Sequence, residues 1–293
     1  MLKKLPVAPK ILKNDLKGYN YFAMLSSCMF SINENVTIDL SHVERIDHNL
    51  QAILGCIMIS HAKQNYSDKL VVNKNILRQM SMTGFKKAFR WQENMLISDK
   101  AKNDFQYMTF NINEHRLFSN YVENDVLQHP QMPKLSLKLK KHFQNSILEL
   151  FINAKEHAGC TEVFACGHYF PHRKMIFFTV VDMGVTIKKK VVSYWQEKGI
   201  KSELSPITWA TKKGNSTKGT TGGLGFYLIE EFVRLNEGKL FILSGNEYYH
   251  FDQGIKYKNL KSSFEGTAIT IGINSADKRA YILSTENKDE IEF

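Results

Sequence analysis

Apolar and polar positions in the first ninety residues follow two periods. Residues 35–40 alternate as a strand with one buried face, and residues 69–73 resemble a second strand. Apolar side chains recur at helical spacing over residues 49–61, and a further helix is expected over residues 76–82. An amphipathic stretch over residues 19–32 precedes them. The order strand, helix, strand, helix predicts a small open α/β domain with a parallel sheet.

The second half begins with a long amphipathic pattern over residues 135–157, which predicts a helix with Ser136 as N-cap and Gly159 at its end. A hairpin is expected next, followed by a lysine-rich, flexible segment over residues 188–221 that contains one short helix. A glycine-led helix follows from residue 222. The strands predicted in this half cover residues 162–170, 175–181, 239–244, 248–251 and 267–273.

This order predicts an α/β sandwich with helices on one face of its sheet. Two prolines near residue 130 indicate a linker, so we divide the chain into domains at 1–130 and 131–293. A length of 293 residues with 43% hydrophobic residues is enough for two modest cores.

Hydropathy and charge bear on where the protein works and on what it could bind. No apolar run approaches the roughly 18 residues of a spanning helix, and the basic start of the chain lacks the apolar core of a signal peptide, so we expect a cytoplasmic protein without a membrane segment. The net charge of +10 raises the question of a nucleic-acid partner. The lysines are dispersed, with clusters over residues 3–17 and 188–218 and no interleaved aromatic stripe, so charge alone gives little support for nucleic acid. The lysine cluster over residues 188–218 has another explanation, because lysines are also expected next to a bound phosphate group.

The cysteines have apolar neighbours and no close pairing, which predicts reduced, buried thiols at Cys28, Cys56, Cys160 and Cys166. A zinc site is conceivable from Cys160, Cys166, His168 and His172. These residues fall on the predicted hairpin, and a spacing of six between the cysteines misses the short knuckle of structural zinc sites. We therefore disfavour a metal there.

The chemistry centres on the predicted helix 135–157. Residues four apart share one helix face, so Glu149 and Asn153 project side by side, with His157 one turn further on. A carboxylate can act as a base on water, and an amide oxygen can bind a hard divalent cation. Nucleotide hydrolysis without a P-loop needs both groups.

Two glycine-bearing segments add to this face. Asp182 ends a hydrophobic strand and can accept a hydrogen bond from an exocyclic amine, while Gly184 allows a ring to approach the backbone. Gly223, Leu224 and Gly225 lead directly into a helix, where exposed backbone N–H groups favour phosphate. The pattern is neither a P-loop nor a Rossmann fingerprint, because it lacks Gly-Lys-Ser/Thr and follows no strand of a βαβ unit.

Taken together, residues 135–275 resemble the GHKL superfamily of ATP-binding domains, which share the Bergerat fold. The resemblance implies ATP and Mg²⁺ as cofactors. It places Glu149 at the position of the general base, Asn153 at that of the magnesium ligand, and His157 at a polar position near the phosphates.

The same resemblance identifies Asp182 with the adenine-binding aspartate and Gly184 with the glycine beside it. It identifies the segment from Gly223 through Leu224 to Gly225 with the second glycine box, and Thr267 with the threonine that supports the adenine site.

Two further positions bear on this resemblance. Thr186 stands where the first glycine box usually has a second glycine, which leaves the local backbone path open. Lys218 ends a Ser-Thr-Lys run similar to one in some members, and it either reaches a phosphate or remains a solvated loop charge.

In the N-terminal half, residues 36–50 resemble the core of a STAS domain, the fold of bacterial anti-sigma-factor antagonists. Phosphorylatable members carry a serine in the turn before the helix. Here the turn reads Asp47-His48-Asn49-Leu50, without serine or threonine, so it is not expected to accept phosphate in the usual way.

These features predict an ATP-dependent regulatory switch that hydrolyses Mg-ATP and closes a lid over residues 188–221 to control a partner protein. One alternative is a protein serine kinase of the anti-sigma type, and another is an ATP-sensing adaptor with negligible turnover. The partner is unidentified, and a homodimer remains open.

Overall fold

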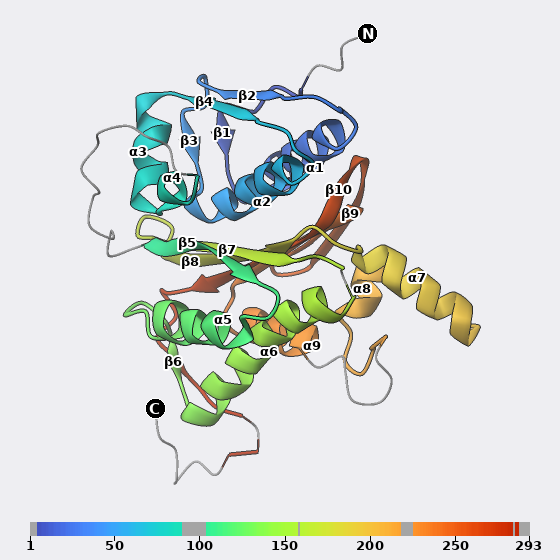
Figure 1. Ribbon diagram of the computed structural model, residues 1–293. Helices are drawn as coiled ribbons and strands as arrows, with labels where there is room; N and C mark the ends of the chain where they lie inside the picture. The colour runs from blue at the N-terminus through green and yellow to red at the C-terminus, as the bar shows by residue number, and fades with distance from the viewer. Residues whose placement is uncertain (1–4, 90–103, 158, 218–224, 284, 287–293) are drawn as a thin grey trace.

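The chain folds around a five-stranded antiparallel sheet with strand order β5-β7-β8-β10-β9 (Figure 1). A computed structural model describes residues 5–89, 104–157, 159–217, 225–283 and 285–286. The sheet consists of β5 (Asp104–Asn111), β7 (Glu162–Phe170), β8 (Met175–Asp182), β9 (Lys239–Phe251) and β10 (Ile255–Asn274). The hairpin predicted for the second half is confirmed as β7 and β8.

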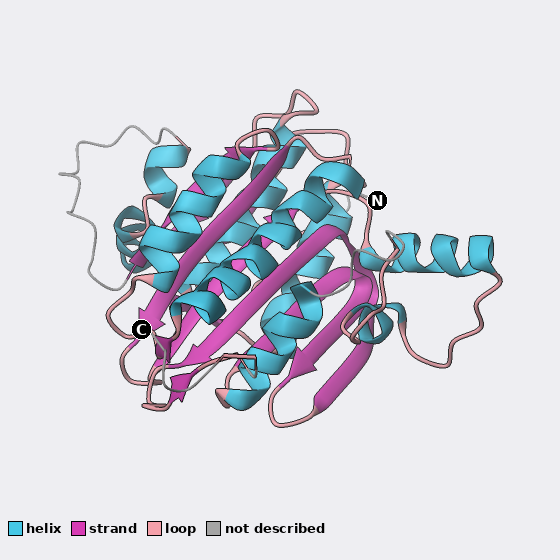
Figure 2. Cartoon of the chain, turned by 90° about the horizontal axis from the view of Figure 1, so that it is seen from below, coloured by secondary structure: helices cyan, strands magenta, loops and turns pink. Residues whose placement is uncertain are grey.

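Three helices cover one face of this sheet: α5 (His115–Tyr121), α6 (Leu137–His157) and α9 (Gly225–Leu235) (Figures 1 and 2). A short π-helix, η2 (Val122–Leu127), follows α5 and packs with them. Ser136 caps α6, because its hydroxyl accepts a hydrogen bond from the Leu139 N–H at 3.2 Å. Gly159, just past the helix, has φ +63°, so both predicted ends of this helix are confirmed.

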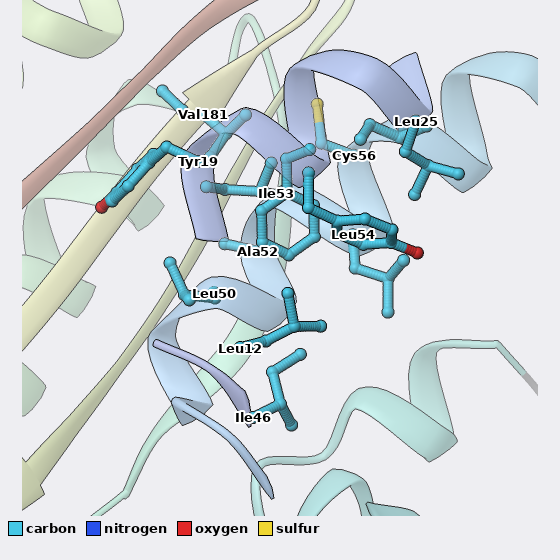
Figure 3. Packing of buried hydrophobic residues seen from close by; sticks show 14 of the residues in the cluster. Leu12, Tyr19, Leu25, Ile46, Leu50, Ala52, Ile53, Leu54, Cys56 and Val181 are labelled. Atoms are coloured by element: carbon cyan, nitrogen blue, oxygen red, sulfur yellow. The ribbon is translucent and has the colours of Figure 1, made fainter. Parts of the chain in front are cut away.

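The opposite face of the sheet packs against the N-terminal helices α1 (Leu16–Met29) and α2 (Gln51–Ala62). Alternate residues of β8 serve the two faces: Phe177 and Val181 meet the N-terminal helices, whereas Phe178 meets α5 and α6. Figure 3 shows Val181 among N-terminal side chains. Helices therefore cover both faces rather than the one that we expected, which explains why β8 is apolar almost throughout.

The N-terminal unit, residues 5–89, contains the predicted order of strand, helix, strand and helix. Strands β2 (Thr37–Leu40) and β4 (Lys69–Val72) pair in parallel, with α2 between them in sequence. Helix α3 (Lys74–Met82) follows, capped by Asn73, and the short helix α4 (Phe85–Ala88) follows α3. A second parallel pair joins β1 (Ile11–Leu12) to β3 (Arg45–Ile46), and the 3₁₀ turn η1 (His48–Leu50) leads into α2.

Strand pairing crosses the boundary that we predicted near residue 130. Strand β5 precedes that boundary but pairs with β7 after it and forms an edge of the sheet. Phe118 of α5, also before the boundary, stacks on Phe151 of α6 with ring centroids 4.9 Å apart. The segment 104–127 is thus built into the C-terminal sheet and its helical layer.

Two parts of the C-terminal half differ from the expected pattern. The lysine-rich segment contains a regular helix, α7 (Ile187–Lys198), as well as the predicted short helix, found as α8 (Pro206–Ala210). Residues 239–251 form one strand rather than two, because Gly245, at φ +59°, lies at a shift in strand register and not in a turn. A small parallel pair joins β6 (Lys134–Leu135) to β11 (Ala280–Tyr281).

Two further expectations concern the cysteines and the membrane. All four cysteines are free thiols; Cys56 and Cys166 are buried, and Cys28 and Cys160 are half-buried. Within the described residues, no helix combines the length and apolar character needed to cross a lipid bilayer.

Candidate functional site

One pocket lies between the helical layer and the end of the sheet. Its walls come from α6, β8, β10, α7, α8 and α9, and they include Glu149, Asn153, Asp182, Lys190, Trp209 and Thr267. The cavity measures about 90 Å³, and one buried water needs about 10–15 Å³. It has room for several waters or one flat ring, so most of any larger ligand would lie outside the enclosed part.

The face of α6 supplies the first two polar groups. Glu149 and Asn153 are one helical turn apart, and both line the pocket, as their spacing predicted. The backbone oxygen of Asn153 accepts a hydrogen bond from the Lys190 ammonium at 3.4 Å. The pocket therefore combines a carboxylate and an amide from α6 with a cation from α7.

The end of the sheet supplies Asp182 and Thr267, which lie directly opposite each other on β8 and β10. The Thr267 hydroxyl is 2.8 Å from the Ser244 hydroxyl, and that hydroxyl also accepts the Ile187 N–H at 2.9 Å. Gly266 is required here, because a Cβ would overlap the backbone oxygen of Asp182 and lie 2.8 Å from Met183 Cα. This close approach fixes Thr267 beside the carboxylate.

Asp182 carries a buried oxygen, Oδ1, with no hydrogen-bond partner among the described residues. Burial raises the pKa of Asp182 to about 7, although the Lys190 cation and a hydrogen bond from the Gly184 backbone oppose the shift. Buried polar atoms are normally paired, so an unpaired acceptor facing a pocket is suited to a ligand that donates a hydrogen bond.

Glu149 and Gly225 meet where α6 crosses the start of α9. A Cβ on Gly225 would lie 2.8 Å from Cδ of Glu149 and would overlap its carboxylate. The predicted glycine is therefore needed for close approach to Glu149. The N-terminus of α9 also favours negative charge at this point, through its exposed backbone N–H groups.

Of the remaining predicted positions, the structure describes Thr186 and the backbone of His157. Thr186 needs no glycine geometry, since it has φ −68° and caps α7 through a hydrogen bond from the Lys189 N–H. His157 is the last residue of α6, and its side chain lies outside what the structure describes. Lys218, Gly223 and Leu224 also lie outside the described residues.

Lys190, Trp209 and Phe226 line the pocket but were not singled out from the sequence. Lys190 lay in a segment read as a flexible loop. The sequence does contain a signal for helix α7: Thr186 is a suitable N-cap, and Gly199 is a suitable left-handed terminator at the other end. Trp209 packs edge-on against Trp195, with ring centroids 5.8 Å apart.

A scan against models of known protein families gives no match to this chain. A search of the curated proteins likewise finds none that matches it in sequence. The functional assignment must therefore come from the residues and their arrangement.

Proposed function

We propose that the chain is an ATP-binding regulatory switch of GHKL type that hydrolyses Mg-ATP to control a partner protein. Its Bergerat ATP-binding fold would comprise residues 131–293 together with segment 104–127, which the sheet and its helical layer include. One observation carries the proposal: a single pocket gathers Glu149, Asn153, Asp182 and Thr267 from one helix and two strands. The motifs in the sequence and their resemblance to GHKL domains point to the same four residues.

Asp182 and Thr267 would recognise the base. The buried, unpaired oxygen of Asp182 is an acceptor for the exocyclic amine of adenine. Guanine has a carbonyl oxygen at the matching ring position, and two acceptors repel each other. The pocket is therefore expected to prefer ATP to GTP.

Glu149 and Asn153 would serve the phosphate end. The Asn153 side-chain oxygen suits Mg²⁺, which when bound neutralises phosphate charge. Glu149 would act as the general base that takes a proton from the attacking water. Gly225 would keep the space that the carboxylate occupies.

The switch would arise because α7 and α8 form part of the pocket wall, through Lys190 and Trp209. A bound nucleotide would contact both α6 and these two helices of the lid segment 188–221, and so would hold the lid closed. Hydrolysis would release the lid. The N-terminal unit would bind the controlled partner, since none of its described residues lines the pocket.

Glu149→Ala tests the catalytic part. We expect the variant to retain ATP binding and to lose turnover by about 10²–10⁴-fold, the usual contribution of a general base. Normal turnover would remove Glu149 from this role. With γ-labelled ATP and the wild-type chain, label on a partner protein would favour the serine kinase alternative, whereas tight binding without phosphate release would favour the adaptor.

A further inference from the structure

A second cluster of ionisable side chains lies where the N-terminal unit meets the sheet, and the proposed ATP site uses none of it. His48 begins η1, Asp104 begins β5, and His168 lies in β7. Asp104 and His168 are direct partners across the two strands, so their side chains leave the same face of the sheet. That face is covered by the N-terminal unit, which brings His48 to them.

The two imidazoles converge on one carboxylate oxygen. Nδ1 of His48 is 2.7 Å and Nδ1 of His168 is 2.6 Å from Oδ1 of Asp104. The ring centroids are 4.1 Å apart. The other oxygen of Asp104, Oδ2, is buried and has no hydrogen-bond partner among the described residues. Hydrogen bonds from both imidazoles therefore go to Oδ1 of Asp104, and Oδ2 is left without one.

We propose that His48, Asp104 and His168 bind one divalent transition-metal ion of the zinc class. One ligand atom from each residue already lies within 4.8 Å of the other two. Bonds of about 2.0–2.2 Å to a tetrahedral zinc place neighbouring ligand atoms roughly 3.3 Å apart, so each histidine nitrogen needs to move roughly 0.6–0.7 Å away from Oδ1 of Asp104. Two imidazoles favour zinc over Mg²⁺ and Ca²⁺, which prefer oxygen ligands.

The site has an open side. A cavity of about 230 Å³ borders the cluster and is lined by His48, His168, His172 and Arg173, among others. The two histidine side chains are each 12% exposed, whereas the Asp104 side chain is fully buried. Three protein ligands and an adjoining cavity leave a coordination position for water or a small anion.

This set differs from the zinc ligands weighed from the sequence. Only His168 of that earlier group takes part. Cys166 lies beside the cluster, but its thiol donates hydrogen bonds to the backbone oxygens of His48, at 3.3 Å, and Phe105, at 3.7 Å. It therefore positions His48 rather than supplying a ligand.

Bound metal would join the N-terminal turn to two strands of the sheet. The flanking residues of that turn already make such links: Asp47 pairs with Arg173, and the Asn49 amide donates to the Thr179 hydroxyl at 2.8 Å. Metal binding is thus expected to stabilise the docking of the N-terminal unit on the sheet.

The test uses the full chain without an affinity tag, stripped of metal with a chelator. Zn²⁺ is titrated by calorimetry, and Co²⁺ serves as a spectroscopic probe of the coordination. We expect one equivalent of Zn²⁺, visible d–d bands of low-symmetry Co²⁺, and a zinc-dependent rise in the unfolding temperature. His48→Ala and Asp104→Asn should each weaken Zn²⁺ binding by at least about 10-fold and abolish that rise.

His172→Ala is the matched control, because His172 lines the same cavity but is outside the cluster and exposed. It should bind Zn²⁺ like the wild type. The proposal is overturned if the wild-type chain binds no stoichiometric Zn²⁺, which needs no variant to fold, or if His172→Ala alone loses binding. ATP binding is measured in parallel, so failure here is separate from failure of the proposed function.

Discussion

Gly225 leaves the space in which the Glu149 carboxylate lies, since a Cβ at residue 225 would sit 2.8 Å from Glu149 Cδ. The two residues come from α9 and α6, and 67 residues lie between the end of α6 at His157 and the start of α9. The start of one helix therefore sets the position of the candidate base on the other.

Gly225→Ala tests this relationship. The added methyl group should displace the Glu149 side chain and lower ATP hydrolysis by up to about 10²-fold, because misplacing a catalytic group by about 1 Å has effects of this size. Stability should change little, because alanine favours a helix over glycine by about 0.5–1 kcal/mol and the Glu149 side chain can move aside. The measurements are steady-state hydrolysis and urea unfolding.

Gly254→Ala is the control for that experiment. Gly254 has no atom within 4 Å of an added Cβ, so its replacement should leave hydrolysis unchanged. Equal hydrolysis by Gly225→Ala and the wild type would show that the contact with Glu149 has no catalytic consequence.

Asp182 makes a prediction about stability and pH. Its pKa rises from 3.8 to about 7 on folding because of burial. The folded state thus binds this proton more tightly than the unfolded state, and the stabilising effect, complete below about pH 4, is lost as the pH rises through 7. Asp182→Asn should therefore be more stable than the wild type at pH 8, by at most about 4 kcal/mol.

The difference should become small near pH 4, where Asp182 is protonated in the folded state and about half protonated in the unfolded state. Urea unfolding at pH 4, 6 and 8 measures it. An advantage of the variant that is independent of pH would mean that Asp182 does not titrate near neutrality.

The Asp47–Arg173 pair makes a prediction about the docking of the N-terminal unit. The guanidinium binds both carboxylate oxygens, at 2.7 and 2.9 Å, and the Asp47 side chain is fully buried. Among the described residues, Arg173→Met would leave the buried Asp47 charge with hydrogen bonds from Asn14 alone, which donates from its backbone and side chain at 3.0 Å. We expect a loss of about 3 kcal/mol in unfolding free energy.

Glu44→Ala provides the comparison, because the Lys10–Glu44 pair is exposed and its loss should have little effect on stability. If Arg173→Met is as stable as Glu44→Ala, the buried pair does not hold the two parts together.

The local elements were largely predictable because their signals are local. Ser136 and Gly159 mark the ends of α6, and the turn at residues 171–174 marks the β7–β8 hairpin. The residues proposed for nucleotide binding follow from the same kind of signal: Glu149 and Asn153 share a helix face, and Asp182 ends a strand.

Long-range pairing was not predictable in this way. Nothing in the sequence near residue 104 indicates that strand β5 pairs with β7 some sixty residues later. The apolar character of β8 indicates two covered faces, yet it does not say that α1 and α2 cover one of them. The His48–Asp104–His168 cluster depends on the pairing of β5 with β7 and on the docking of the N-terminal unit on the sheet. The sequence therefore does not show that these three residues meet.

The most direct test of the central claim is calorimetric titration of the chain with ATP and GTP, each with and without Mg²⁺. We expect one ATP per chain, tighter binding with Mg²⁺, little binding of GTP, and at least about 10-fold weaker ATP binding by Asp182→Asn, which loses the charged acceptor for the adenine amine. Absence of ATP binding, or equal binding of ATP and GTP that Asp182→Asn leaves unchanged, would contradict the account.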